Sequence, residues 1–164
     1  MSTSLILLIL SHTPLWVWAI LGYVLYIGIS QLQPRALPRK RLILLPSVWL
    51  VFGAWGVERS FGLGAAPLAA WVIGLGLSFG LMRYSRWPAG ARYDAAQGRY
   101  LVPGSALPLT LMLLIFISKY VLGVGLAMRP ELAAMLPVAL GFSLVFGAIG
   151  GTLAGRSANI LTRT

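Results

Sequence analysis

The sequence contains no cysteine and very few acidic residues. The lack of cysteine excludes disulfides, thiolate metal ligands and thiol redox chemistry. Three carboxylate side chains and one histidine are too few for a convincing acid–base pair or metal site. The HExxH, GxSxG and Walker A patterns are missing as well. We therefore expect a protein that is not an enzyme and that needs no metal or other cofactor.

Charge is scarce in this chain, and nearly all of it is positive. Charged residues make up 10% of the 164 residues and apolar residues 59%, whereas about a quarter of a soluble domain is charged. The mean hydropathy is +0.87. A net charge of +10 would suggest nucleic acid in a soluble protein, but basic loops that orient a membrane protein explain it better. We expect no nucleic-acid partner.

Five apolar stretches predict a bundle of five transmembrane helices, which makes this an all-α integral membrane protein with one domain over residues 1–164. A bilayer core of about 30 Å requires about 20 apolar residues per helix, so the chain has room for five spans and short loops. The predicted spans are about 14–30, 42–57, 66–82, 105–128 and 132–155.

A short apolar segment, Leu5–Leu10, precedes the first span and is too short to cross a membrane. The sequence then reads Ser-His-Thr-Pro, which predicts Thr13 as the N-cap and Pro14 as the first helical residue. We expect Leu5–Leu10 to lie in the outer interface, or to extend the helix beyond a kink at Pro14.

Positive charge falls in alternate gaps between the spans. Ten of the 13 Lys and Arg residues lie in the first gap, the third gap and the C-terminal tail. The positive-inside rule places these three segments in the cytoplasm and the N-terminus outside. We expect the two basic loops to contact anionic lipid headgroups. The predicted contacts are Arg35, Arg39, Lys40, Arg41, Arg83, Arg86, Trp87, Arg92 and Arg99.

The third gap also predicts a small cytoplasmic β-hairpin over residues 92–102. Asp94 can open its turn, and Gly98 can adopt the positive φ that closes it. Within the spans, Gly76 and Gly80 form one GxxxG spacing, and Gly151 and Gly155 form another. Such spacings favour close helix packing, either within the monomer or between copies.

Lys119 is the residue most in need of explanation, because it lies just past the middle of the fourth predicted span. A charged lysine at that depth costs about 2.5–3.5 kcal/mol. Two interpretations remain open. Lys119 could bind a ligand, ion or proton, or it could be structural, either snorkelling to the interface or forming an ion pair. Glu58, near the outer end of the second span, is the best candidate for its counter-charge.

Aromatic residues suggest where a ligand would approach Lys119. An aromatic belt fully explains the outer position of the tryptophans. The sharper interpretation is an outward-facing aromatic pocket near Glu58, which could hold an organic cation. His12 would then lie at the pocket rim. A single histidine beside Thr-Pro is more often a capping or interfacial residue than a metal or haem ligand. The predicted site residues are Lys119, Tyr120, Glu58, Trp16, Trp18, Trp55, Trp71 and His12.

Several motifs resemble a family of small uncharacterised bacterial inner-membrane proteins that is known as a domain of unknown function. They are Thr13-Pro14-x-Trp16-Val17-Trp18, Pro103-Gly104-Ser105 with Leu107-Pro108-Leu109, Ile115-Phe116-x-x-Lys119-Tyr120, and Gly123-Val124-x-Leu126-Ala127. The resemblance covers most of the chain. It implies a bacterial origin and a multi-pass protein of the cytoplasmic membrane, and it brings no activity or ligand.

Two functions follow from these observations. The leading hypothesis is non-enzymatic binding or passage of a small solute or ion at Lys119. The alternative is an assembly protein or accessory subunit that docks to a membrane partner, or to a second copy, through its glycine-rich helix faces. A solvent-accessible cavity that reaches Lys119 would favour the first hypothesis. A dry, paired lysine with an exposed flat glycine face would favour the second.

Overall fold

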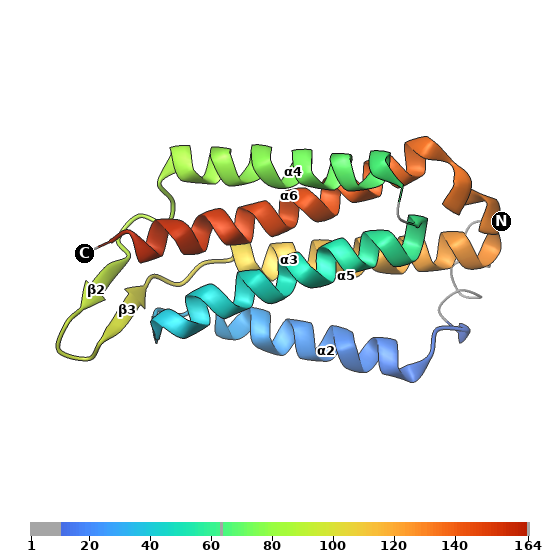
Figure 1. The fold of residues 1–164 in the computed structure, drawn as a ribbon. Helices are drawn as coiled ribbons and strands as arrows, with labels where there is room; N and C mark the ends of the chain where they lie inside the picture. Colours follow the sequence, from blue (N-terminus) through green and yellow to red (C-terminus); the bar gives the residue numbers. More distant parts are fainter. Residues whose placement is uncertain (1–10, 63, 164) are drawn as a thin grey trace.

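The computed structural model describes residues 11–62 and 64–163, and this part of the chain is mainly helical (Figure 1). The predicted interfacial segment Leu5–Leu10 lies outside the described residues. The helices are α2 (Leu15–Ser30), α3 (Arg39–Phe61), α4 (Ala65–Ser85), α5 (Leu107–Met128) and α6 (Leu136–Leu161), with a 3₁₀ helix at Pro130–Ala134. Three short strands are β1 (Arg35–Leu37), β2 (Arg92–Asp94) and β3 (Arg99–Val102).

Helices α3, α4, α5 and α6 are each long and apolar enough to cross a membrane. Helix α2 is apolar but has 16 residues, fewer than the roughly 20 that a bilayer core needs. Four of the five predicted spans thus match helices of sufficient length. The last predicted span ends too early, at residue 155, because α6 continues through Arg156 to Leu161.

Prolines mark where several of these helices begin. Pro14 and Pro38 immediately precede α2 and α3, and Pro108 lies in the first turn of α5. A proline suits these positions because the first backbone N–H groups of a helix have no partner within the helix. The prediction that Thr13 caps the first helix is wrong: the N-cap is Pro14, without a side-chain cap. The Thr13 hydroxyl instead lies 2.7 Å from the Tyr120 hydroxyl on α5.

The helices form two groups. Helix α6 lies at the centre of the larger group, with α4 packed closely along it and α3 on another side. Helices α2 and α5 pack on each other and form the second group, which has few contacts with α6. Helix α6 is accordingly the most buried of the apolar helices.

Glycines allow α4 and α6 to approach closely. A Cβ atom added to Gly147 would collide with the carbonyl oxygen of Trp71, and one added to Gly151 would collide with that of Leu75. The spacing Gly151–Gly155 therefore packs inside the monomer. A Cβ added to Gly76 or Gly80 would meet nothing within 4 Å. The Gly76–Gly80 spacing therefore lies on the outer face of α4.

The predicted hairpin is present as β2 and β3, which pair antiparallel with Tyr93 opposite Tyr100. The Asp94 carboxylate accepts hydrogen bonds from the backbone N–H groups of Ala96 and Gln97, and Gly98 has a φ of +61°. However, the sheet has three strands rather than two, in the order β1-β3-β2. The prolines on either side of β1 keep the first loop extended, and β1 pairs with the free edge of β3.

A small core anchors the sheet to the ends of α3 and α6. Leu37, Tyr100 and Val102 from the sheet pack with Leu42 of α3 and the fully buried Ile160 of α6. The sheet therefore closes one end of the bundle. The sheet also brings together the two basic loops, which are the first and third gaps between the predicted spans and lie about sixty residues apart in sequence.

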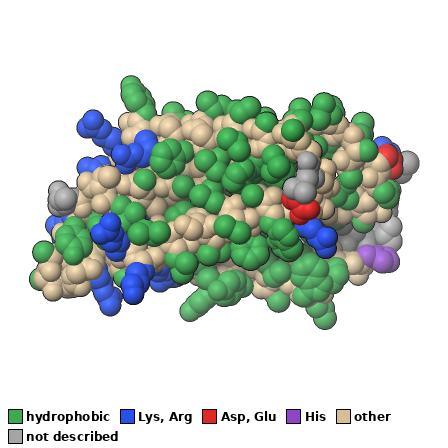
Figure 2. Space-filling model, viewed as in Figure 1, with side chains coloured by type: hydrophobic (Ala, Val, Ile, Leu, Met, Phe, Trp, Pro, Cys, Tyr) green, Lys and Arg blue, Asp and Glu red, His purple; other side chains and the backbone are tan. Residues whose placement is uncertain are grey.

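The side of the bundle is apolar, and most of the basic side chains on the face shown gather at the end that carries the sheet (Figure 2). Large apolar side chains on the outside of the helices are highly exposed, such as Leu81 at 71% and Leu77 at 69%. A water-soluble protein rarely leaves such extensive apolar surface uncovered. This surface fits a hydrocarbon environment around the helices.

Candidate functional site

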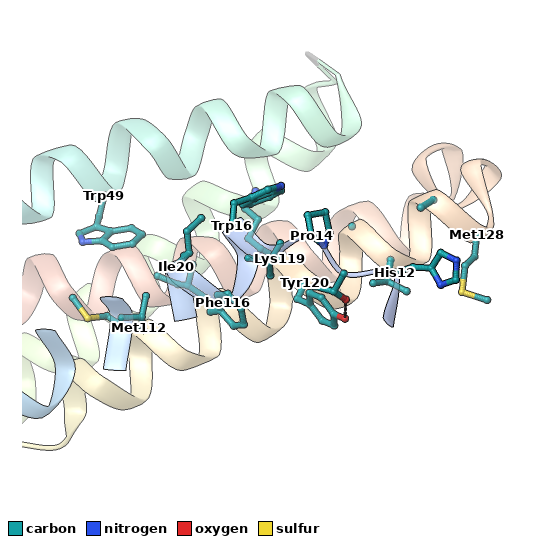
Figure 3. A pocket seen from close by; sticks show the side chains of 17 residues that line it. His12, Pro14, Trp16, Ile20, Trp49, Met112, Phe116, Lys119, Tyr120 and Met128 are labelled. Carbon is teal, nitrogen blue, oxygen red and sulfur yellow. Dashed lines mark hydrogen bonds between the residues drawn. The ribbon is translucent and has the colours of Figure 1, made fainter. Parts of the chain in front are cut away.

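An open groove of about 800 Å³ runs between α2 and α5, and Trp49 of α3 contributes to its wall (Figure 3). Residues one or two turns apart on the same side of each helix line it, because helical positions i, i+3, i+4 and i+7 share a face. Its volume lies in the range of small-molecule sites. The lining residues are His12, Thr13, Pro14, Trp16, Val17, Ile20, Val24, Trp49, Met112, Ile115, Phe116, Lys119, Tyr120, Gly123, Val124, Ala127 and Met128.

Lys119 lines this groove, and its ammonium group contacts α6 and α3. The Nζ atom lies 4.4 Å from the centroid of the Phe146 ring on α6. It also lies beside Gly56 of α3, where an added Cβ would come within 2.6 Å of it. The lysine therefore bridges the boundary between the two helix groups.

The surroundings of Lys119 do not balance the cost of its charge. Helix α5 is long and apolar enough to cross a membrane, and a lysine ammonium near the middle of a helix that does so costs about 2.5–3.5 kcal/mol. A contact with an aromatic face returns about 0.5–2 kcal/mol, so Phe146 offsets only part of that cost. An anionic group in the groove would supply the missing counter-charge.

No ion pair joins Lys119 to Glu58, both of which lie in the described part of the chain. Glu58 is half-buried in the last turn of α3, and it does not line the groove. Glu131, in the 3₁₀ helix, does not line the groove either. None of the three Asp and Glu side chains of this chain is among the residues that line the groove.

Tyr120 links α5 to the segment that leads into α2. Its hydroxyl lies 2.7 Å from the Thr13 hydroxyl (Figure 3), and its ring stacks on Phe116 one turn earlier, with centroids 6.3 Å apart. His12 also lines the groove, and its Nδ1 atom lies 3.3 Å from the Ser11 hydroxyl. These contacts place the polar groups that precede α2 at the same end of the groove as Tyr120.

The structure divides the tryptophans that were predicted to form the site. Trp16 lines the groove, whereas Trp18, Trp55 and Trp71 are absent from its lining. Trp18 and Trp55 are exposed on the outside of the bundle, where an aromatic belt would lie. Trp71 packs into the apolar cluster around Val57, Leu122 and Phe146.

Sequence reasoning did not find Trp49 or Phe146, which contribute to the groove and to the Lys119 contact. Trp49 lies in the half of its span that was assigned to the cytoplasmic side, so it was not grouped with the outer tryptophans. Phe146 lies on a helix far along the chain, and its approach to Lys119 depends on how α5 and α6 are rotated. A helix-face analysis of α5 alone could have grouped Met112, Phe116 and Lys119.

The residues predicted to contact lipid headgroups lie at or near the end of the bundle that carries the sheet (Figure 2). Arg39, Lys40, Arg41, Arg83, Arg86, Arg92 and Arg99 are exposed, and Arg35 and Trp87 are half-buried. Burial, together with the positive charge of Arg41, lowers the pKa of Arg35 below its ordinary value. An arginine remains charged in proteins, so this end of the bundle keeps its full positive charge.

Arg156 is a buried guanidinium that the sequence reasoning assigned to the tail. It is 7% exposed and lies 5.4 Å from the Trp87 ring centroid. Its Nε atom is buried and has no hydrogen-bond partner in the structure. Trp87, which was predicted to contact lipid headgroups, therefore packs against Arg156.

The fold and the groove define an α-helical protein with four helices long and apolar enough to cross a membrane, and with a lysine in the wall of an apolar cavity. The family described as "Family of unknown function (DUF6622)" matches residues 2–164, and the chain belongs to this family. No curated protein and no solved structure matches the chain.

Proposed function

We propose that this chain is a non-enzymatic, multi-pass protein of the bacterial inner membrane that binds or passes a small solute or ion at Lys119. The observation that supports this proposal is the position of Lys119 in the wall of an 800 Å³ groove that has no acidic side chain among its lining residues. The groove offers a ligand one positive charge, and it offers the two hydroxyls of Thr13 and Tyr120.

The shape and lining of the groove favour an organic anion with an apolar body. Aromatic and aliphatic side chains make up most of the wall, so a hydrocarbon or aromatic group would be buried favourably there. A carboxylate or similar anion next to Lys119 would form a charge-assisted hydrogen bond with the ammonium. Because the groove is open between α2 and α5, such a ligand could enter from the side within the bilayer.

The orientation is part of this proposal. The positive-inside rule favours the sheet end in the cytoplasm, where its basic residues would contact anionic lipid. Helix α2 would then be the first of five membrane segments, with the Lys119 ammonium in the hydrocarbon layer. Cysteine accessibility labelling at Ser11 and Gln97, at opposite ends of the bundle, tests this orientation. Labelling of both positions from the same side would contradict it.

Equilibrium binding of a fluorescent long-chain carboxylate to the full chain in lipid nanodiscs tests the ligand class. Lys119→Met removes the charge and keeps much of the side-chain length, and we expect it to weaken binding about tenfold or more. Lys40→Met is the matched control, because Lys40 is the other lysine of the chain and does not line the groove. Equal affinity of the wild type and Lys119→Met would contradict the proposal.

One observation favours the alternative, an assembly protein that uses a glycine face. Gly76 and Gly80 lie on the outer face of α4 with open space above them, as a helix from a second copy or another membrane protein would require. Gly76→Leu and Gly80→Leu would block such a contact. Loss of a complex in these variants, with unchanged carboxylate binding, would support this alternative.

A further inference from the structure

A second cavity lies at the sheet end of the bundle, well away from the Lys119 groove. It has a volume of about 190 Å³ and lies between the last turns of α4 and α6. Its lining residues are Arg83, Arg86, Asn159, Thr162 and Arg163. Three arginines thus line one small cavity, and its lining includes no carboxylate.

Neutral groups hold two of the three arginines in place. Arg83 donates a hydrogen bond of 2.9 Å to the amide oxygen of Asn159, and Arg163 donates one of 2.9 Å to the carbonyl oxygen of Arg86. Asn159 itself is 4% exposed, and its NH₂ group donates to the carbonyl oxygens of Met82 and Trp87. Because a guanidinium has five N–H donors, both arginines keep donors for a ligand.

The positive charge around this cavity exceeds the negative charge that the described residues supply to balance it. The C-terminal ends of α4 and α6 each carry about half a negative charge, which is roughly one charge against three arginines. Glu58 and Glu131 lie at the opposite end of the bundle, and the Asp94 carboxylate accepts hydrogen bonds within its own turn. An excess of roughly two positive charges therefore remains.

We infer that this cavity is a binding site for a phosphate group. A phosphate monoester carries about 1.5 to 2 negative charges at neutral pH, which matches the excess. Its oxygens accept the paired N–H donors that a guanidinium presents. The phosphate could come from a lipid headgroup or from a soluble phosphate, and the two sources share this chemistry. The site is stoichiometric and saturable, unlike the general attraction of a basic loop to anionic lipid.

The test uses the full chain in detergent with two probes. Native mass spectrometry measures retention of short-chain phosphatidic acid, and thermal unfolding measures the stabilisation by inorganic phosphate. The variant Arg86→Gln/Arg163→Gln removes two charges from the cavity. The control Arg92→Gln/Arg99→Gln removes two exposed charges from the hairpin at the same end of the bundle.

We expect the cavity variant to lose at least about tenfold in affinity for the probe that binds, and the hairpin control to lose less than about twofold. Retention of phosphatidic acid alone would assign the lipid headgroup, and stabilisation by inorganic phosphate would assign a soluble phosphate. Arg86→Gln alone gives the same test if the double variant does not fold, because the structure shows no hydrogen bond from the exposed Arg86 side chain to the described residues. Binding of neither probe, or equal losses in both variants, would overturn the inference.

Discussion

The ammonium of Lys119 on α5 lies over the aromatic ring of Phe146 on α6, 4.4 Å from its centroid. The two helices otherwise have few contacts. Phe146 is 5% exposed and belongs to the apolar cluster that also contains Val57 and Leu122. This contact therefore links the charge in the groove to the packed interior of the larger helix group.

A double-mutant cycle with Lys119→Met and Phe146→Leu should show coupling between these two residues. Leucine keeps an apolar side chain in the cluster but removes the aromatic face, so the cation–π contribution is lost. We expect a coupling free energy of about 0.5–2 kcal/mol in the free energy of unfolding. The measurement is reversible unfolding of the full chain in detergent. Additive effects of the two substitutions would show that the ring does not stabilise the ammonium.

Gly56 is the small residue on α3 that leaves room for the Lys119 ammonium. A Cβ at this position would come within 2.6 Å of Nζ and within 3.5 Å of Cε, both at the flexible end of the lysine side chain. Gly56→Ala should therefore move the ammonium at little cost in stability. We expect a change in carboxylate affinity of about threefold or more, since the strength of a charge-assisted hydrogen bond depends on its geometry.

The matched control for Gly56→Ala is Gly123→Ala. Gly123 also lines the groove, but a Cβ there would meet nothing within 4 Å. Carboxylate affinity should remain close to the wild-type value in this variant. If Gly123→Ala had the larger effect, the ligand would lie near Gly123 and away from the ammonium.

Acylation by a small, membrane-permeant amine reagent should modify Lys119 in intact membranes, because its exposed surface lines an open groove. Lys40 on the surface at the sheet end is the built-in comparison. Peptide mass spectrometry would measure both sites in the same sample. The long-chain carboxylate should protect Lys119 and leave Lys40 reactive. If Lys119 did not react while Lys40 was fully labelled, the reagent could not reach Lys119, and the lysine would have a structural role.

The predicted helices were close to those observed because apolar length and proline position are local properties. Pro14 indicated the start of the first predicted span, and α2 begins directly after it. The hairpin was also predicted, because Asp94 and Gly98 encode its turn directly. The third strand was missed because β1 forms only when β3 presents a free edge, and that pairing joins residues far apart in sequence.

The candidate site was harder to predict, because it depends on how whole helices are rotated and packed. Depth in the membrane suggested Glu58 as the partner of Lys119, but no ion pair joins these two described residues. The lysine points instead toward Phe146 and Gly56. Likewise, sequence spacing treated both GxxxG pairs alike, whereas only Gly151–Gly155 contacts another helix.

The two glycine faces should differ sharply in their tolerance of alanine. Gly147→Ala would force a methyl group against the carbonyl oxygen of Trp71 on α4, and we expect a loss of about 1–3 kcal/mol in the free energy of unfolding. Gly76→Ala meets open space and should be neutral, or stabilising by up to about 1 kcal/mol from helix propensity. Thermal unfolding in detergent would compare them. Equal destabilisation would mean that the Gly76 face is also packed in the protein.

Asn159 should be the most sensitive polar residue at the sheet end. Its buried side chain accepts a hydrogen bond from Arg83 and donates to the carbonyl oxygens of Met82 and Trp87. Asn159→Ala leaves all three partners without this bond, so we expect a loss of about 2–4 kcal/mol in the free energy of unfolding. Asn159→Asp keeps the acceptor for Arg83 but cannot donate to either carbonyl, and it should also destabilise the protein. Unfolding in detergent would measure both variants, and a wild-type midpoint for Asn159→Ala would show that these bonds do not hold α6 against the end of α4.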